Sequence, residues 1–137
     1  MSSAILEGLV TISKVLLVED NIDRLTIFQE GLERYGLSVK GYSSPLDALA
    51  EFHPGIYDVA IVDIMMYTMN GKELSNSLAH VDKAIKLIFL TPTNEDNNEI
   101  NTMTSNHLWI VRKPITVKSL FEEVISILAL EQNIPLL

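Results

Sequence analysis

The sequence predicts a single α/β domain, built as a doubly wound, five-stranded parallel sheet with five helices. Short apolar runs, which suit strands buried on both faces of a sheet, alternate with segments whose apolar residues recur every three or four positions, as in amphipathic helices. The 137 residues are enough for one core and too few for two cores and a linker. Because strands that alternate with helices are joined by right-handed crossovers, we expect the strands to be parallel.

The first two strands and helices lie in the N-terminal part of the chain. A continuous apolar run after a lysine predicts a buried strand at residues 14–18. Asn21 can cap a following helix, which should stop at Gly36. Residues 37–42 are short and extended in character, and Ser44 followed by a proline marks the start of the next helix.

The remaining strands are predicted from three apolar runs, at residues 58–62, 86–91 and 108–111. A short apolar stripe after the first of these runs predicts a helix, and the Asn70-Gly71 pair before it is interpreted as a turn in a loop. Thr116 caps a last helix that ends near residue 130. Residues 92–107 are rich in Asn and Thr, so we expect the helix there to be weak and to be the mobile part of the domain.

These elements divide the chain into an N-terminal extension (1–13), the domain (14–130) and a C-terminal tail (131–137). The net charge of −8, without a cluster of basic residues, argues against direct binding of nucleic acid. The absence of Cys excludes disulfides and thiolate metal sites. The chain starts without the basic region of a signal peptide, and no apolar run approaches the ~20 residues that span a bilayer. We therefore expect a cytoplasmic protein with no membrane segment.

Polar residues stand at the ends of four of the predicted strands. Glu19 and Asp20 follow the first strand, Asp63 the third, Thr91 ends the fourth, and Lys113 follows the fifth. Parallel strands of a doubly wound sheet place their sites beyond their carboxyl ends, so we expect these side chains to meet at one edge.

The chemistry of this set favours a metal ion and a phosphoryl group. Three clustered carboxylates repel one another unless a cation lies between them, and oxygen ligands suit Mg²⁺. A carboxylate beside the metal could attack phosphorus, while an ammonium and a hydroxyl could bind the transferred group. Taken singly, an Asp at a strand end is more often a turn or capping residue. The functional interpretation therefore depends on the joint pattern.

Four segments carry a resemblance to a known family: VLLVEDN, VDIMMYTMNGKEL, LIFLT and VRKPI. They resemble the motifs of response-regulator receiver domains of two-component signalling, the CheY-like superfamily, and the match covers residues 14–130. The resemblance implies a flavodoxin-like (βα)5 fold with strand order 2-1-3-4-5. It implies a signalling domain rather than an enzyme, one that catalyses only its own phosphorylation and dephosphorylation.

The resemblance also implies roles at the site. Asp63 would accept a phosphoryl group from a phosphohistidine of a sensor histidine kinase or a phosphotransfer protein. The metal, Mg²⁺ or Mn²⁺, would be bound directly by Asp20 and Asp63, by Glu19 mostly through water, and by the backbone carbonyl of Met65.

Two further residues would turn phosphorylation into a conformational signal. Thr91 would move to hydrogen-bond the phosphoryl group, and Lys113 would pair with it, placed by a cis peptide before Pro114. The changed contacts to an output protein would use the surface formed by the helix within 92–107, the fifth strand and the last helix. Whether that surface also forms a homodimer stays open.

The sequence departs from the family pattern at several positions. Receivers usually have Pro where this chain has Tyr67, and the small residue after the Thr is here Pro92, which favours an extended Thr. Ile110, beside Trp109, replaces the aromatic switch residue of many relatives. Met65 offers no polar group to orient an attacking water, so we expect slow loss of the phosphoryl group.

Two other functions, a binding module and a phosphatase, compete with the phosphorylated switch. A receiver-like module that binds proteins without phosphorylation is the main alternative. An aspartyl phosphatase would need an acid-base residue where Met65 stands. His53, His80 and His107 lack metal-site spacing and are expected at the surface, and no Gly-rich nucleotide loop follows the first strand. No effector domain follows the last helix, so the chain is either a stand-alone receiver or a fragment of a larger regulator.

Overall fold

The computed structural model describes residues 2–92 and 107–131 of the chain. The strands are β1 (Lys14–Val18), β2 (Ser38–Tyr42), β3 (Val59–Asp63), β4 (Lys86–Pro92) and β5 (Leu108–Lys113). The helices are α1 (Ser3–Ile12), α2 (Ile22–Arg34), α3 (Pro45–Glu51), α4 (Gly71–Val81) and α5 (Val117–Glu131). All strand pairs are parallel, in the order β2-β1-β3-β4-β5. The predicted fold class and strand order are confirmed.

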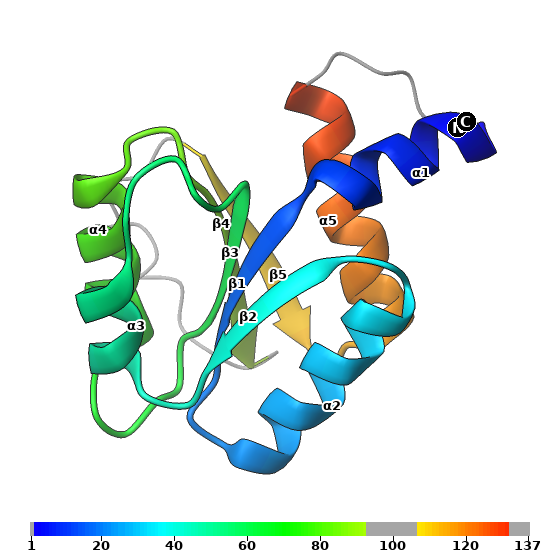
Figure 1. Ribbon diagram of the computed structural model, residues 1–137. Helices are drawn as coiled ribbons and strands as arrows, with labels where there is room; N and C mark the ends of the chain where they lie inside the picture. The colour runs from blue at the N-terminus through cyan, green and yellow to red at the C-terminus, as the bar shows by residue number, and fades with distance from the viewer. Residues whose placement is uncertain (1, 93–106, 132–137) are drawn as a thin grey trace.

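Helices cover both faces of the sheet, as Figure 1 shows, with α3 and α4 on one side and α1, α2 and α5 on the other. The strand side chains alternate between the two cores. In β1, Val15 and Leu17 pack toward α2 and α5, while Leu16 and Val18 pack toward α3 and α4. This explains why β1 is apolar throughout, since both of its faces are buried.

The predicted helix caps on the N-terminal half are formed. Asn21 Oδ1 accepts the Arg24 N–H at 2.9 Å, and Ser44 Oγ accepts the Asp47 N–H at 3.2 Å. Each bond satisfies one of the free N–H groups of a helix start. Because the cap at Asn21 directly follows the acidic pair, it fixes where the chain turns away from the sheet edge.

The interpretation of Asn70-Gly71 as a turn in a loop was wrong. Asn70 is the cap of α4, accepting the Lys72 N–H at 2.7 Å, and Gly71 is the first helical residue. A Cβ on Gly71 would lie 2.4 Å from the backbone oxygen of Asp63 and 2.7 Å from Cα of Ile64. Glycine therefore lets the start of α4 pack directly against the end of β3.

The end of β5 lies beyond the boundary that the sequence predicts. β5 runs on to Lys113, because Thr91 and Pro92 of β4 pair with Arg112 and Lys113 after the apolar run has ended. The charged end of an edge strand carries no apolar signal, although its backbone still pairs. The weak helix expected within 92–107 lies outside the described residues.

The N-terminal extension contains a helix that the sequence analysis did not assign. In Figure 1, α1 lies across the C-terminal half of α5, and Leu6 packs against the core that α5 contributes to. In that half of α5 Ile125 and Ala129 are buried, whereas Glu122, on the same side of the helix but nearer its start, is exposed. No helix in the described part of the chain is long and apolar enough to cross a membrane.

Candidate functional site

The five predicted site residues lie at the carboxyl edge of the sheet. Asp63 is the last residue of β3 and Lys113 the last of β5, while Thr91 is the last but one of β4. Glu19 and Asp20 directly follow β1. Asp63 and Thr91 are 1% and 0% exposed, so both side chains lie within the protein rather than on its surface.

Asp63 is held by cationic and backbone donors. Lys113 Nζ donates a hydrogen bond to Oδ2 and forms an ion pair with it, and the Met65 N–H donates to Oδ1 at 2.9 Å. The Lys113–Pro114 peptide is cis, as the resemblance implied.

The electrostatics of this carboxyl group favour its charged form. Burial tends to raise the pKa of Asp63, but hydrogen bonds from Glu19, Lys113 and the Met65 N–H, together with the Lys113 charge, hold that pKa below its ordinary value. Asp63 is therefore an ionised, buried carboxylate.

Glu19 is the second buried carboxyl group of the site, at 3% exposed. Its Oε1 accepts a hydrogen bond from Arg24 Nε at 2.7 Å and one from the Asn21 N–H at 3.3 Å. Burial, then the hydrogen bond and negative charge of Asp63, raise the pKa of Glu19 to about 7, while Arg24 opposes the rise. Two neighbouring carboxyl groups favour a shared proton, and below a pH of about 7 Glu19 carries it.

Asp20 is turned toward a different partner. Its Oδ2 accepts a hydrogen bond from the Tyr67 N–H at 2.7 Å. This bond joins the end of β1 to the segment between β3 and α4. The Tyr67 side chain is fully exposed, so the residue meets the site only through its backbone.

Thr91 presents a buried hydroxyl group that lacks a bond. Its Oγ1 finds no hydrogen-bond partner among residues 2–92 and 107–131. A buried hydroxyl without a partner costs about 1–3 kcal/mol. Thr91 lies in regular strand structure together with Pro92, as the sequence predicted for a residue before proline.

The donor atoms suit a hard cation, but they do not form a finished ligand set. Glu19, Asp20 and Asp63 supply only oxygen ligands, which Mg²⁺ prefers. Within the described ranges, however, no three Asp, Glu, His or Cys side chains are grouped so that they could hold a metal ion. A cation that bound Glu19 Oε1 or Asp20 Oδ2 would compete with the hydrogen bonds that these oxygens accept from Arg24 and Tyr67.

The sequence analysis missed two groups at the site, Arg24 and the backbone N–H of Tyr67. Arg24 lies in the first turns of α2, five residues after Glu19, a spacing that brings it back over the end of β1. It also lines a cavity of about 370 Å³ together with Met65, Tyr67 and Asn70. The cavity is also lined by Ile64, the residue that directly follows Asp63, so it adjoins the end of β3.

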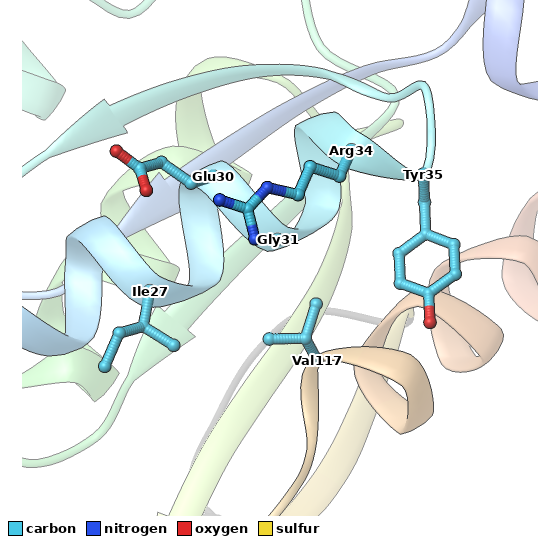
Figure 2. A pocket seen from close by; sticks show the side chains of 6 residues that line it. All are labelled: Ile27, Glu30, Gly31, Arg34, Tyr35 and Val117. Carbon is cyan, nitrogen blue, oxygen red and sulfur yellow. The ribbon is translucent and has the colours of Figure 1, made fainter.

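Another cavity, of about 500 Å³, lies away from this edge, between α2 and the start of α5. Figure 2 shows Val117 of α5 facing Gly31 of α2, with Tyr35 beside them. A Cβ on Gly31 would lie 2.5 Å from Val117, so the cavity borders a close helix contact. None of the predicted site residues lines it.

The predicted surface positions of His53, His80 and His107 are confirmed, since all three are exposed.

Comparison with known proteins identifies the family. The sequence matches the response regulator receiver domain family over residues 15–125. The chain belongs to this family.

Individual relatives are distant. The chain is 28% identical over 107 residues to the transcription factor SKN7 of Candida albicans, covering 78% of this chain and 19% of that protein. It is 25% identical over 115 residues to the transcriptional regulatory protein ZraR of Salmonella typhimurium, covering 84% of this chain and 26% of that one. The chain thus spans about a quarter or less of the length of these relatives.

Solved structures confirm the fold. A CheY-like receiver domain protein of Methanospirillum hungatei superposes with a TM-score of 0.77 at 21% identity, covering 88% of this chain and 97% of the other. A receiver domain protein of Clostridium thermocellum gives 0.76 at 23%, covering 89% and 98%.

Proposed function

We propose that the chain is a phosphorylation-driven switch in which Asp63 accepts a phosphoryl group. The donor is a phosphohistidine of a sensor histidine kinase or a phosphotransfer protein, and Mg²⁺ or Mn²⁺ is required. The observation that carries the proposal is the environment of Asp63, an ionised carboxylate that is 1% exposed and lies beside the ammonium of Lys113. At the same sheet edge lies the Thr91 hydroxyl, which is unpaired within the described residues.

Each group has a role in the transfer. An oxygen of Asp63 attacks phosphorus as the bond from phosphorus to the donor nitrogen breaks. Lys113, which now pairs with Asp63, neutralises the negative charge that the phosphoryl group brings. The Thr91 hydroxyl, which has no partner among the described residues, can donate to a phosphoryl oxygen and so gain a hydrogen bond.

The metal would be held by Glu19, Asp20, Asp63 and the backbone carbonyl of Met65. A bound divalent cation stabilises charge on the transferred oxygens. The chain itself prepares the nucleophile: hydrogen bonds from Lys113 and the Met65 N–H fix both oxygens of Asp63.

The direct test is intact mass after incubation with acetyl phosphate and Mg²⁺. We expect one phosphoryl group on the wild type and none on Asp63→Asn or in the presence of a chelator. Asp58→Asn is a matched control, because Asp58 lies at the opposite end of β3 and accepts the Lys14 N–H. It should be phosphorylated like the wild type. Absence of any added mass, while a known receiver is modified in parallel, would refute the proposal.

The output is a change of protein contacts. We propose that the contact surface lies on β5, α5 and the segment 92–107. Ile110 on β5 is 42% exposed.

The alternative function is a binding module that works without phosphorylation. It is favoured by one observation: Glu19 and Asp20 already have partners in Arg24 and Tyr67. Normal partner binding by the Asp63→Asn variant would support this alternative.

A further inference from the structure

A hydrogen bond between Asp20 and Tyr67 joins two parts of the site. It links a carboxylate at the end of β1 with a backbone N–H between β3 and α4, at a donor–acceptor distance of 2.7 Å. Hydrogen bonds to a charged acceptor are about twice as strong as neutral ones. The connection between β3 and α4 is thus tied to one of the proposed metal ligands.

The donor is the backbone alone. The Tyr67 side chain is fully exposed, and the only bond that fixes this residue to Asp20 comes from its N–H. Every residue except proline supplies such a donor. Position 67 can therefore gain or lose the bond without any change to a buried side chain.

The bond also bears on how the carboxylates are arranged. Glu19 interacts with Asp63 and Arg24, whereas Asp20 is directed to Tyr67. In the part of the chain that the structure describes, no three carboxylates or imidazoles are grouped for a metal ion. Asp20 Oδ2 already accepts a hydrogen bond from the segment after β3, so a cation that binds this oxygen has to displace the Tyr67 N–H.

We propose that the Tyr67 N–H is a latch on Asp20: it holds the carboxylate to the segment between β3 and α4, and a divalent cation binds only when the bond opens. This inference rests on the proposed function, since it takes Asp20 as a metal ligand. Tyr67 is here a positioning residue that acts through Asp20. Metal binding then competes with the latch and frees the segment that leads into α4.

If the Tyr67 N–H instead oriented Asp20 for metal binding, its effect on metal affinity would have the opposite sign. Donors that fix a ligating carboxylate usually strengthen metal binding, and their removal weakens it by about 10- to 100-fold. A latch weakens metal binding, and its removal strengthens it. The sign of the change in affinity therefore separates the two roles.

The experiment compares Tyr67→Pro, which removes the N–H, with Tyr67→Ala, which removes the ring and keeps the N–H. Mg²⁺ affinity is measured by titration calorimetry, and thermal unfolding is followed without metal. We expect Tyr67→Pro to bind Mg²⁺ about five- to tenfold more tightly and to unfold about 2–5 °C earlier without metal. Tyr67→Ala should match the wild type in both.

A second background shows whether the effect passes through Asp20. In Asp20→Ala, which has no acceptor, Tyr67→Pro should cause no further drop in the unfolding temperature. An equal drop in both backgrounds would mean strain from proline and would overturn the proposal.

The remaining outcomes separate this inference from the proposed function. If the wild type binds Mg²⁺ and Tyr67→Pro binds equally or more weakly, only the latch is overturned. If neither binds, the latch and the proposed metal dependence both fall. If only Tyr67→Pro binds, the latch is supported.

Discussion

Lys113 Nζ donates to Asp63 Oδ2 across β4, which lies between the strands that carry the two residues. Asp63 is buried, so its charge depends on this ammonium for compensation. We expect Lys113→Gln to lower the free energy of unfolding by about 1–3 kcal/mol and to slow phosphorylation by acetyl phosphate. Urea denaturation and time-resolved mass spectrometry measure the two effects. Unchanged stability would show that the pair contributes nothing net to folding.

The raised pKa of Glu19 predicts a pH-dependent stability in metal-free buffer. The native state holds this proton up to a pKa of about 7, against 4.5 for the free group. Between these values the native state binds more protons than the unfolded state, so the contribution of Glu19 to stability is full below pH 4.5 and is lost as the pH rises through 7.

Glu19→Gln keeps a neutral hydrogen-bonding group and cannot titrate. Unfolding free energies measured from pH 5 to 8 should fall more steeply with pH for the wild type than for this variant. The lowered pKa of Asp63 acts with the opposite sign, because its contribution is lost at pH values below 3.8. Parallel curves for wild type and Glu19→Gln would contradict the shared-proton interpretation.

The Thr91 hydroxyl, which finds no partner in the part of the chain that the structure describes, predicts two opposite effects of removing it: higher stability and a weaker response to phosphorylation. Thr91→Val replaces the buried hydroxyl with a methyl group of similar size, so the unphosphorylated domain should gain about 1 kcal/mol in stability. The variant should still accept a phosphoryl group, but phosphorylation should raise its unfolding temperature less than it does for the wild type.

Ser75 provides the matched control for Thr91. Its hydroxyl is also buried without a partner among the described residues, but it lies within α4. Ser75→Ala should therefore leave the effect of phosphorylation on the unfolding temperature unchanged. An equal response in both variants would remove Thr91 from the switch.

The close contact of Gly71 with the end of β3 predicts that Gly71→Ala lowers the free energy of unfolding. In Gly71→Ala the new Cβ would meet the Asp63 backbone oxygen at 2.4 Å, and neither backbone segment can yield without moving the nucleophile. We expect a loss of about 2 kcal/mol or more and slower phosphorylation. Gly8→Ala in α1, where no atom lies within 4 Å of the new Cβ, should instead gain up to about 1 kcal/mol.

The exposed side chain of Met65 predicts a long-lived phosphoryl group. Met65 is 55% exposed and carries no atom that could orient a water molecule toward Asp63. Met65→Asn should shorten the half-life of phosphorylated protein severalfold, as measured by the decay of the added mass. A wild-type half-life as short as that of the variant would disprove this explanation.

The positions of the site residues could be predicted because parallel strands end at one edge. Asp63 ends a run of buried apolar residues, and in a parallel sheet that alone places it beside the ends of the neighbouring strands. The partners of each acid could not be predicted in this way. Whether Glu19 or Asp20 contacts Asp63 depends on the direction of the chain after β1, and the N–H of Tyr67 carries no signal in the sequence.

The elements outside the alternation of strands and helices were harder to predict. α1 begins at a cap on Ser2, whose Oγ accepts the Ile5 N–H at 3.2 Å. Its residues lack the charged face that marks a surface helix, and the half-buried Leu6 packs against a core to which α5, far along the sequence, contributes. A pattern within one segment cannot show that contact.

The packing of α1 on α5 bears on how the protein is made. α1 precedes the five strands in the chain and α5 follows them, so the two helices that pack together are synthesised at different times. During that interval the first helix has no partner, and it can dock only when the sheet has closed and α5 has formed. The contact between α1 and α5 therefore forms late in the folding of this domain, and it cannot form in a chain halted before α5.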